Sequence, residues 1–300
     1  PQHGLDYWPK NAKIIQIDAD GKMLGLVKPI SVGINGDAKE AAAALLAKLK
    51  TRDVACIKNK AERDTTIKGE KNAWEEELTS WTHEKDPYSI DMIKDSKVMH
   101  PREMLRAIEN ALPKNSIVST DIGNICSVSN SYLRFDEPRS MLAAMSFGNC
   151  GYAFPVAVGA KIASPNRPVF AYVGDGAWGI SLNELLTCAR EKIGVTVILF
   201  NNGQWGAEKK NHVDFYSRRY QGVELVNPSW AAVAKSFGCE GVTVDKVGDI
   251  GAAIQAAVKN QAEGKTTVIE MMVTKELGDP FRRDALSKPV RHLDKYKSFV

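Results

Sequence analysis

Two short and almost continuously apolar segments lie on either side of a helical pattern in the middle of this chain. Residues 168–173 read Pro-Val-Phe-Ala-Tyr-Val, and residues 195–200 read Val-Thr-Val-Ile-Leu-Phe. Such runs are typical of strands buried on both faces of a parallel sheet. Between them, the apolar residues of segment 180–192 recur at the spacing of one helix face. This strand, helix and strand unit constrains the fold most strongly, because its crossover brings both strand ends to the same edge of the sheet.

Polar residues follow each of the two strands at that edge. Gly174, Asp175 and Gly176 follow the first strand, and Asn201 and Asn202 end the second, 27 residues later. We therefore expect the Asp175 carboxylate and the Asn202 amide to meet. Mg²⁺ takes about six oxygen ligands, usually one or two from protein and the rest from phosphate and water. The pair predicts a site for a divalent cation and a diphosphate, with the glycines allowing close backbone approach.

Two other interpretations of this segment stay open. Gly-Asp-Gly can be a plain turn and Asn-Asn a strand-ending cap. Gly174, Gly176 and Gly179 also fit the G-x-G-x-x-G spacing of a dinucleotide site. Paired amides argue against the dinucleotide site, because that site uses an acid at the end of the next strand.

The rest of the chain extends the same alternating pattern. Further strands are predicted at 116–121, 141–145, 241–244 and 266–273, with helices near 102–112, 151–163, 229–237 and 250–261. Together they predict an α/β fold with a doubly wound six-stranded parallel sheet. It is preceded by part of a second Rossmann-like α/β domain, with strands at 12–20 and 30–34 and a helix at 36–50. The charged segment 58–85 fits a surface helix or linker, and we place the boundary between the two units near residue 90.

Composition excludes several classes of protein. The 300 residues carry 40 basic and 36 acidic side chains, a balance that does not favour nucleic acid or a membrane surface as partner. Five cysteines without C-x-x-C spacing indicate neither a zinc site nor a disulfide framework, and instead suggest reduced thiols in the cytoplasm. No apolar run approaches the length of a membrane span.

Other segments are weaker candidates for the same site. Gly123 and Asn124 follow the strand at 116–121 and could bond a phosphate oxygen, although the residues alone favour a turn and helix cap. The Gly-rich turn at 148–155 suits either close packing or a ligand. Segment 203–219 should lie over the site, so we expect its basic residues to favour an anionic substrate or to form a solvated face: Lys209, Lys210, Arg218 and Arg219. His212 is a possible acid or base, and 281–284 forms a second basic cluster.

The spacing of Gly-Asp-Gly and Asn-Asn resembles that of the thiamine diphosphate enzymes. Residues 12–52 look like the end of the central domain of the acetolactate synthase and pyruvate oxidase group. Segments 204–211, 214–216 and 276–290 are similar to the sulfoacetaldehyde acetyltransferases, and the similarity extends over essentially the whole chain. The resemblance implies four parts: the C-terminal part of a central Rossmann-like domain at 1–56, a charged linker or helix at 57–98, the diphosphate-binding domain at 99–275, and a C-terminal tail at 276–300.

The resemblance also implies roles for individual residues. Asp175, Asn202 and the backbone carbonyl of Gln204 would hold Mg²⁺. The diphosphate would be touched by Gly123, Asn124, Gly174, Gly176 and Ala177. Cys150 stands where relatives carry a bulky apolar residue that supports the cofactor, which is a departure from the family pattern. Substrate-pocket candidates are Ala207, Lys210, Asn211 and Arg282.

The implied activity is conversion of sulfoacetaldehyde and phosphate to acetyl phosphate and sulfite. Family members activate the cofactor with a glutamate on a separate pyrimidine-binding domain that precedes the central domain. This chain has no counterpart of that domain, so the resemblance covers a C-terminal half that needs its other half, within a homodimer or tetramer. We expect little turnover from the chain alone. An acetolactate synthase-like carboligase or decarboxylase and a non-catalytic cofactor-binding subunit remain as alternatives.

Overall fold

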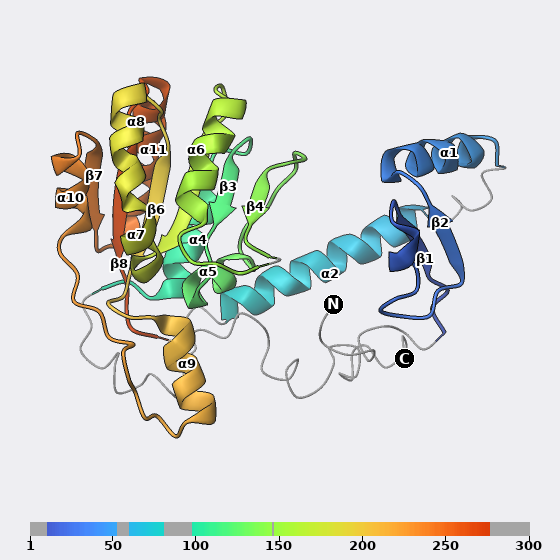
Figure 1. The fold of residues 1–300 in the computed structure, drawn as a ribbon, viewed down its shortest axis with the longest axis horizontal. Coiled ribbons are helices and arrows are strands. Elements are labelled where there is room, and N and C mark those ends of the chain that lie inside the picture. The colour runs from blue at the N-terminus through green and yellow to red at the C-terminus, as the bar shows by residue number, and fades with distance from the viewer. Residues whose placement is uncertain (1–10, 53–59, 81–97, 146, 277–300) are drawn as a thin grey trace. The chain divides into compact units, whose positions relative to one another are not determined.

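The computed structural model describes residues 11–52, 60–80, 98–145 and 147–276 (Figure 1). The chain divides into two compact units, the first within residues 1–75 and the second beginning at Glu76. This division falls inside helix α2 (Lys60–Ser80). No helix of the described ranges combines the length and the apolar character that a bilayer crossing requires.

The second unit contains a six-stranded, all-parallel sheet, as predicted. Its strands run in the order β4-β3-β5-β6-β8-β7. Their bounds are β3 (Ile117–Thr120), β4 (Met141–Ala143), β5 (Val169–Gly174), β6 (Thr196–Asn201), β7 (Glu240–Val244) and β8 (Thr267–Met272). The chain runs outward from β3 to the edge strand β4 and then returns to β5 on the other side of β3. The strand order therefore reverses between β3 and β5, which is where open α/β sheets bind ligands.

Helices cover both faces of this sheet (Figure 1). One face packs against α6 (Ala153–Ala163), α7 (Asp175–Ser181), α8 (Leu185–Glu191) and α10 (Trp230–Ser236). Phe154 and Trp178 fill this layer with their ring centroids 5.2 Å apart. The other face packs against α4 (Pro101–Ala111), α5 (Asn124–Ser129) and α11 (Ile250–Ala262). Side chains alternate between the two apolar layers along each central strand, which explains why those strands read as continuous apolar runs.

The crossover between β5 and β6 differs from the prediction. The sequence predicted one helix over 180–192, whereas the structure has α7, a 3-10 turn η5 (Leu182–Glu184) and then α8. Helix α7 begins at Asp175, directly after the strand, so Gly-Asp-Gly is the start of a helix and not a plain turn. Two helices, α5 and α9 (Gly206–Phe215), were not predicted. Both contribute residues to the site. Helices α10 and α11 agree with the predicted segments to within one residue at each end.

The first unit is small among the described residues. Strands β1 (Ile15–Asp18) and β2 (Val32–Asn35) pair in parallel, with a 3-10 turn η2 (Gly21–Met23) between them. Helix α1 (Ala38–Lys50) begins at an Asp37 cap, whose carboxylate accepts hydrogen bonds from the amides of Lys39 and Glu40. Several apolar side chains here are exposed, because two strands offer too little surface to cover them.

Candidate functional site

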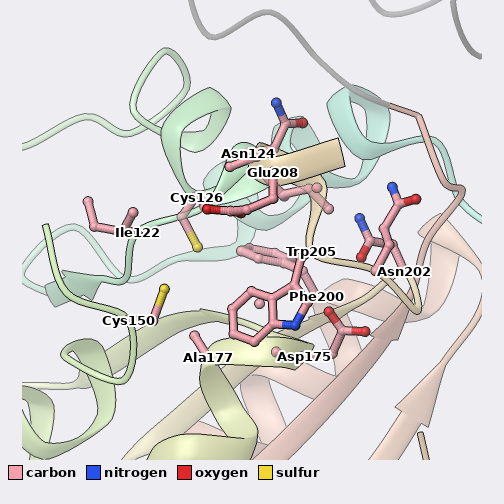
Figure 2. A pocket seen from close by; sticks show the side chains of 17 residues that line it. Ile122, Asn124, Cys126, Cys150, Asp175, Ala177, Phe200, Asn202, Trp205 and Glu208 are labelled. Carbon is pink, nitrogen blue, oxygen red and sulfur yellow. The ribbon is translucent and has the colours of Figure 1, made fainter. Parts of the chain in front are cut away.

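A pocket opens at the carboxyl ends of β3, β5 and β6, where the strand order reverses (Figure 2). Five stretches of chain supply its walls: 122–126 after β3, Cys150, 174–177 after β5, Phe200 and Asn202 on either side of the end of β6, and 204–208 at the start of α9. The cavity has a volume of about 50 Å³. Complete sites for small molecules measure about 300–1,000 Å³, so the described residues enclose less space than such a site.

Asp175 is buried at the base of this pocket, with 2% of its surface exposed. Its Oδ2 accepts a hydrogen bond of 2.8 Å from the backbone N–H of Gly203 and one of 2.6 Å from Nδ2 of Asn227. Burial raises the pKa of the carboxyl group, and these hydrogen bonds act in the opposite direction. The bond to Gly203 shows that the turn after Asn202 folds against Asp175, as the crossover predicted.

Asn202 provides an amide in the same pocket. Its side chain is 8% exposed and has no hydrogen-bond partner within the described residues. A buried amide usually finds a protein partner, so this one is suited to a ligand. A carboxylate and an amide that line the same pocket match the oxygen ligands of Mg²⁺. The residues present therefore fit the cation that the sequence implied.

Gln204 lines the pocket next to Asn202, but its side chain is held by the protein. Its Oε1 accepts 2.9 Å from Lys209 Nζ, and its Nε2 donates 2.9 Å to the backbone carbonyl of Lys275. The side chain is thus engaged behind the pocket wall. The Gln204 side chain is therefore not available to a ligand, and the backbone role implied by the resemblance stays a prediction.

Glycines and one tryptophan shape the pocket wall. The Trp205 indole lies in the middle of the pocket, with Asp175 and Ala177 below it and Asn124 and Glu208 above it (Figure 2). A Cβ atom on Gly176 would lie 2.8 Å from three ring atoms of Trp205, so only glycine allows the indole to sit there. The sequence argument did not single out Trp205 or Glu208.

Asp121 fixes the Gly-rich turn that carries Cys150. Its carboxylate accepts from the backbone N–H groups of Gly151 at 3.0 Å and Ala153 at 2.9 Å. Gly151 has φ +81°, and a Cβ there would approach Ile180 to 2.9 Å. These hydrogen bonds hold the turn at the end of β3. The sulfurs of Cys150 and Cys126 point toward one another in the pocket (Figure 2).

The structure corrects the expectation of a solvated or substrate-facing cation at Lys209. Lys209 is 2% exposed, and its Nζ lies 2.5 Å from the Glu224 carboxylate and 5.1 Å from the Tyr220 ring centre. Its charge is therefore neutralised inside the protein. Of the other substrate-pocket candidates, Ala207 lines the pocket, whereas Lys210 and Asn211 lie further along α9 and do not line it. Arg282 and the basic cluster at 281–284 lie outside the described residues.

The remaining sequence candidates divide in the same way. Gly123, Asn124, Cys150, Gly174, Gly176, Ala177 and Gln204 all line the pocket, together with Asp175 and Asn202. His212 instead packs edge-on against the Tyr216 ring, with the ring centres 5.8 Å apart. Asn227 and Glu270 were missed, although both belong to the hydrogen-bond network around Asp175. An acid within the apolar strand 266–273 was the available signal for Glu270, because a buried carboxylate requires partners.

Comparison with known proteins gives concordant matches. Residues 121–271 match the family model of the thiamine pyrophosphate enzyme, C-terminal TPP binding domain. Sulfoacetaldehyde acetyltransferase of Castellaniella defragrans is 59% identical over 100% of this chain and 51% of its own length. A probable acetolactate synthase large subunit of Methanococcus aeolicus is 30% identical over 83% of this chain and 41% of its own length. The chain spans about half the length of the curated relatives that it matches.

The fold also matches a solved structure. The thiamine diphosphate-dependent 4-hydroxybenzoylformate decarboxylase of Rhodococcus jostii RHA1 superposes with a TM-score of 0.67 at 19% identity. The match covers 90% of this chain and 45% of that one. Identity at this level bears on the fold alone.

Proposed function

The chain belongs to the thiamine pyrophosphate enzymes through its C-terminal TPP-binding domain, and from this premise we propose that it forms the cofactor-diphosphate-binding half of a sulfoacetaldehyde acetyltransferase. The reaction would convert sulfoacetaldehyde and phosphate to acetyl phosphate and sulfite. The similarity to the enzyme of Castellaniella defragrans along the whole chain supports this choice of substrate.

One observation carries the proposed cofactor site. The buried Asp175 carboxylate and the Asn202 amide, which has no partner among the described residues, line one pocket together with backbone from two Gly-rich segments. In this proposal Asp175, Asn202 and the backbone carbonyl of Gln204 hold Mg²⁺, which binds the diphosphate oxygens. Bound thiamine diphosphate supplies a nucleophilic carbon and an electron sink, the chemistry needed to release sulfite and transfer an acetyl group.

The chain's own residues bind and orient. The diphosphate would lie against Gly123, Asn124, Gly174, Gly176 and Ala177, where most side chains are small enough to let it approach the backbone. Cys150, held in place by Asp121, offers a smaller support for the cofactor than the bulky apolar residue of relatives. The candidate substrate contacts, namely Ala207 as a pocket wall and Lys210, Asn211 and Arg282 as polar groups, stay part of this proposal, together with groups from an N-terminal half. Lys209 is excluded as a substrate contact, because it is already paired with Glu224.

The organisation of the whole enzyme is part of the same proposal. We assign residues 1–56 to a central Rossmann-like domain, 57–98 to a linker or helix, 99–275 to the diphosphate-binding domain and 276–300 to a tail. The activating glutamate would come from an N-terminal pyrimidine-binding half, in a homodimer or tetramer located in the cytoplasm. The chain without that half would have little turnover.

The experiment measures sulfite release and acetyl phosphate formation from sulfoacetaldehyde and phosphate, using the complete polypeptide that its gene encodes. In parallel, calorimetry follows thiamine diphosphate binding with and without Mg²⁺. Asp175→Ala should abolish the Mg²⁺-dependent binding, whereas Asp245→Ala, at an exposed position outside the pocket, should leave it unchanged. Equal cofactor affinity of the Asp175→Ala and unaltered proteins would refute the metal site.

The similarity to the acetolactate synthase subunit supports a second candidate function, a carboligase or decarboxylase. Supplying pyruvate in the same assay separates the two. Consumption of pyruvate with no sulfite released from sulfoacetaldehyde would favour the carboligase. Cofactor binding without turnover of either substrate by the complete protein would favour a non-catalytic subunit.

A further inference from the structure

A network of buried polar side chains extends from Asp175 away from the pocket. Asn227 uses a single Nδ2 group to reach two oxygens, Oδ2 of Asp175 at 2.6 Å and Oδ1 of Asn201 at 2.9 Å. The direction of the first bond is fixed by chemistry, because an ionised carboxylate can only accept. Asn227 therefore joins the end of β5, through Asp175, to the end of β6.

The network continues to a firm anchor. Nδ2 of Asn201 donates 2.8 Å to Oε1 of Glu270, a carboxylate on β8 that is 2% exposed. Glu270 also accepts from the backbone N–H groups of Trp230 at 3.2 Å and Ala231 at 3.1 Å, which open helix α10. Oγ1 of Thr243 on β7 donates to it at 3.0 Å. A buried charge with this many donors has a fixed position.

The backbone around Asn227 adds to this rigidity. Pro228 follows it, and the residue before a proline is restricted to extended conformations. Ser229 then caps α10, with its Oγ accepting from the N–H of Ala232 at 3.3 Å. The amide of Asn227 is thus held between a restricted backbone and an anchored partner.

From this geometry we propose that Asn227 is a positioning residue for the cation site, which it serves by fixing the Asp175 carboxylate through the Asn201 and Glu270 network. This inference rests on the proposed metal-binding role of Asp175 and names a residue that acts behind it. Partners of this kind orient the groups that ligate a metal, and their loss typically weakens metal affinity about 10- to 100-fold.

The test follows Mn²⁺ as a spectroscopic substitute for Mg²⁺, in the complete protein with thiamine diphosphate present. Electron paramagnetic resonance of free Mn²⁺ gives its affinity. Asn227→Ala should weaken Mn²⁺ binding about tenfold or more. Asn183→Ala, which removes an exposed amide in η5, should change it less than twofold.

A second variant separates positioning from general loss of structure. Glu270→Gln keeps the size of this side chain, and Asn227 and Asn201 separate it from Asp175 along the network. It should weaken Mn²⁺ binding several-fold in a protein that still melts as one cooperative unit. The effects of Asn227→Ala and Glu270→Gln should also be less than additive, because both act through one network.

Two outcomes overturn the proposal, and they differ in what else they affect. Unchanged Mn²⁺ affinity in both Asn227→Ala and Glu270→Gln, with binding lost in Asp175→Ala, removes the positioning role and leaves the proposed metal site intact. Unchanged affinity in Asp175→Ala as well removes both.

Discussion

Replacing Gly176 by alanine should destabilise the protein when Trp205 is present and stabilise it when Trp205 is replaced by alanine. Gly176 lies in helix α7 and its φ is not positive, so the backbone itself tolerates alanine. A helical Gly→Ala change gains about 0.5–1 kcal/mol in free energy of unfolding. At Gly176 this gain is opposed, because the new Cβ would lie 2.8 Å from Cδ2, Cε2 and Cε3 of Trp205.

The steric term decides the sign in the unaltered protein. Carbon atoms in van der Waals contact lie about 3.5–4.0 Å apart, so the indole must move by roughly 1 Å or leave its place. Overpacking of this kind costs about 1–3 kcal/mol, which exceeds the helical gain. Gly176→Ala should therefore lower the free energy of unfolding by about 1 kcal/mol. In a Trp205→Ala background the ring is absent, and the same change should raise it by about 0.5–1 kcal/mol.

Gly179 provides the matched control in the same helix. Among the described residues, no atom outside the local helix backbone and the two chain neighbours lies within 4 Å of a Cβ built on Gly179, so Gly179→Ala should stabilise by about 0.5–1 kcal/mol in both backgrounds. The assay is urea unfolding of the cofactor-free protein followed by circular dichroism, with tryptophan emission reporting displacement of the indole. Equal effects of Gly176→Ala and Gly179→Ala in the unaltered protein would refute the argument.

Three further outcomes are expected. Lys209→Met should lower the free energy of unfolding by about 1–3 kcal/mol at neutral pH, because it leaves a buried amide oxygen without a donor. Partial burial raises the pKa of Glu224, but hydrogen bonds from Lys209 and Lys275 outweigh this and hold the pKa below 4.5. As pH falls below 4.5 and Glu224 is protonated, the stability difference between the unaltered protein and Lys209→Met should therefore become smaller in thermal melts. Gln261→Leu should destabilise by about 2–4 kcal/mol and speed hydrogen exchange at Val169, whose N–H and C=O both bond the Gln261 amide at 2.9 Å; normal exchange there would contradict this. Maleimide should label Cys150 before the three buried cysteines of the described residues, and thiamine diphosphate should slow the labelling; mass spectrometry of peptides would detect a different order.

Much of the fold follows from local pattern. The runs at 168–173 and 195–200 became β5 and β6, because a strand covered on both faces must be apolar along its whole length. The same pattern predicts that Asp175 and Asn202 lie at one edge of the sheet, and both line the pocket there. Where the sequence argument failed, the pattern was ambiguous: segment 180–192 has helical spacing, yet the structure interrupts it with η5, and α9 was not anticipated.

Roles that depend on partners distant in sequence required the tertiary structure. Lys209 reads as one more surface cation, but the fold buries it against Glu224. Cys150 joins the pocket only because Asp121, 30 residues before Gly151, bonds the turn that carries it. The Trp205 ring likewise fits its place only because residue 176, which is 29 positions earlier in the chain, has no Cβ atom.

The sequence by itself determined the parallel sheet, the edge proposed for ligand binding and the two side chains suited to a cation, since these depend on periodicity and on residue type at strand ends. The tertiary structure decided which polar groups are available to a ligand and which are already bonded within the protein. Asn202 remains without a partner in the described residues, whereas Asn201 next to it is bonded to Asn227 and Glu270. Two neighbouring asparagines are chemically identical in the sequence, and only the direction that each side chain takes from the end of β6 separates the proposed ligand from the residue that supports it.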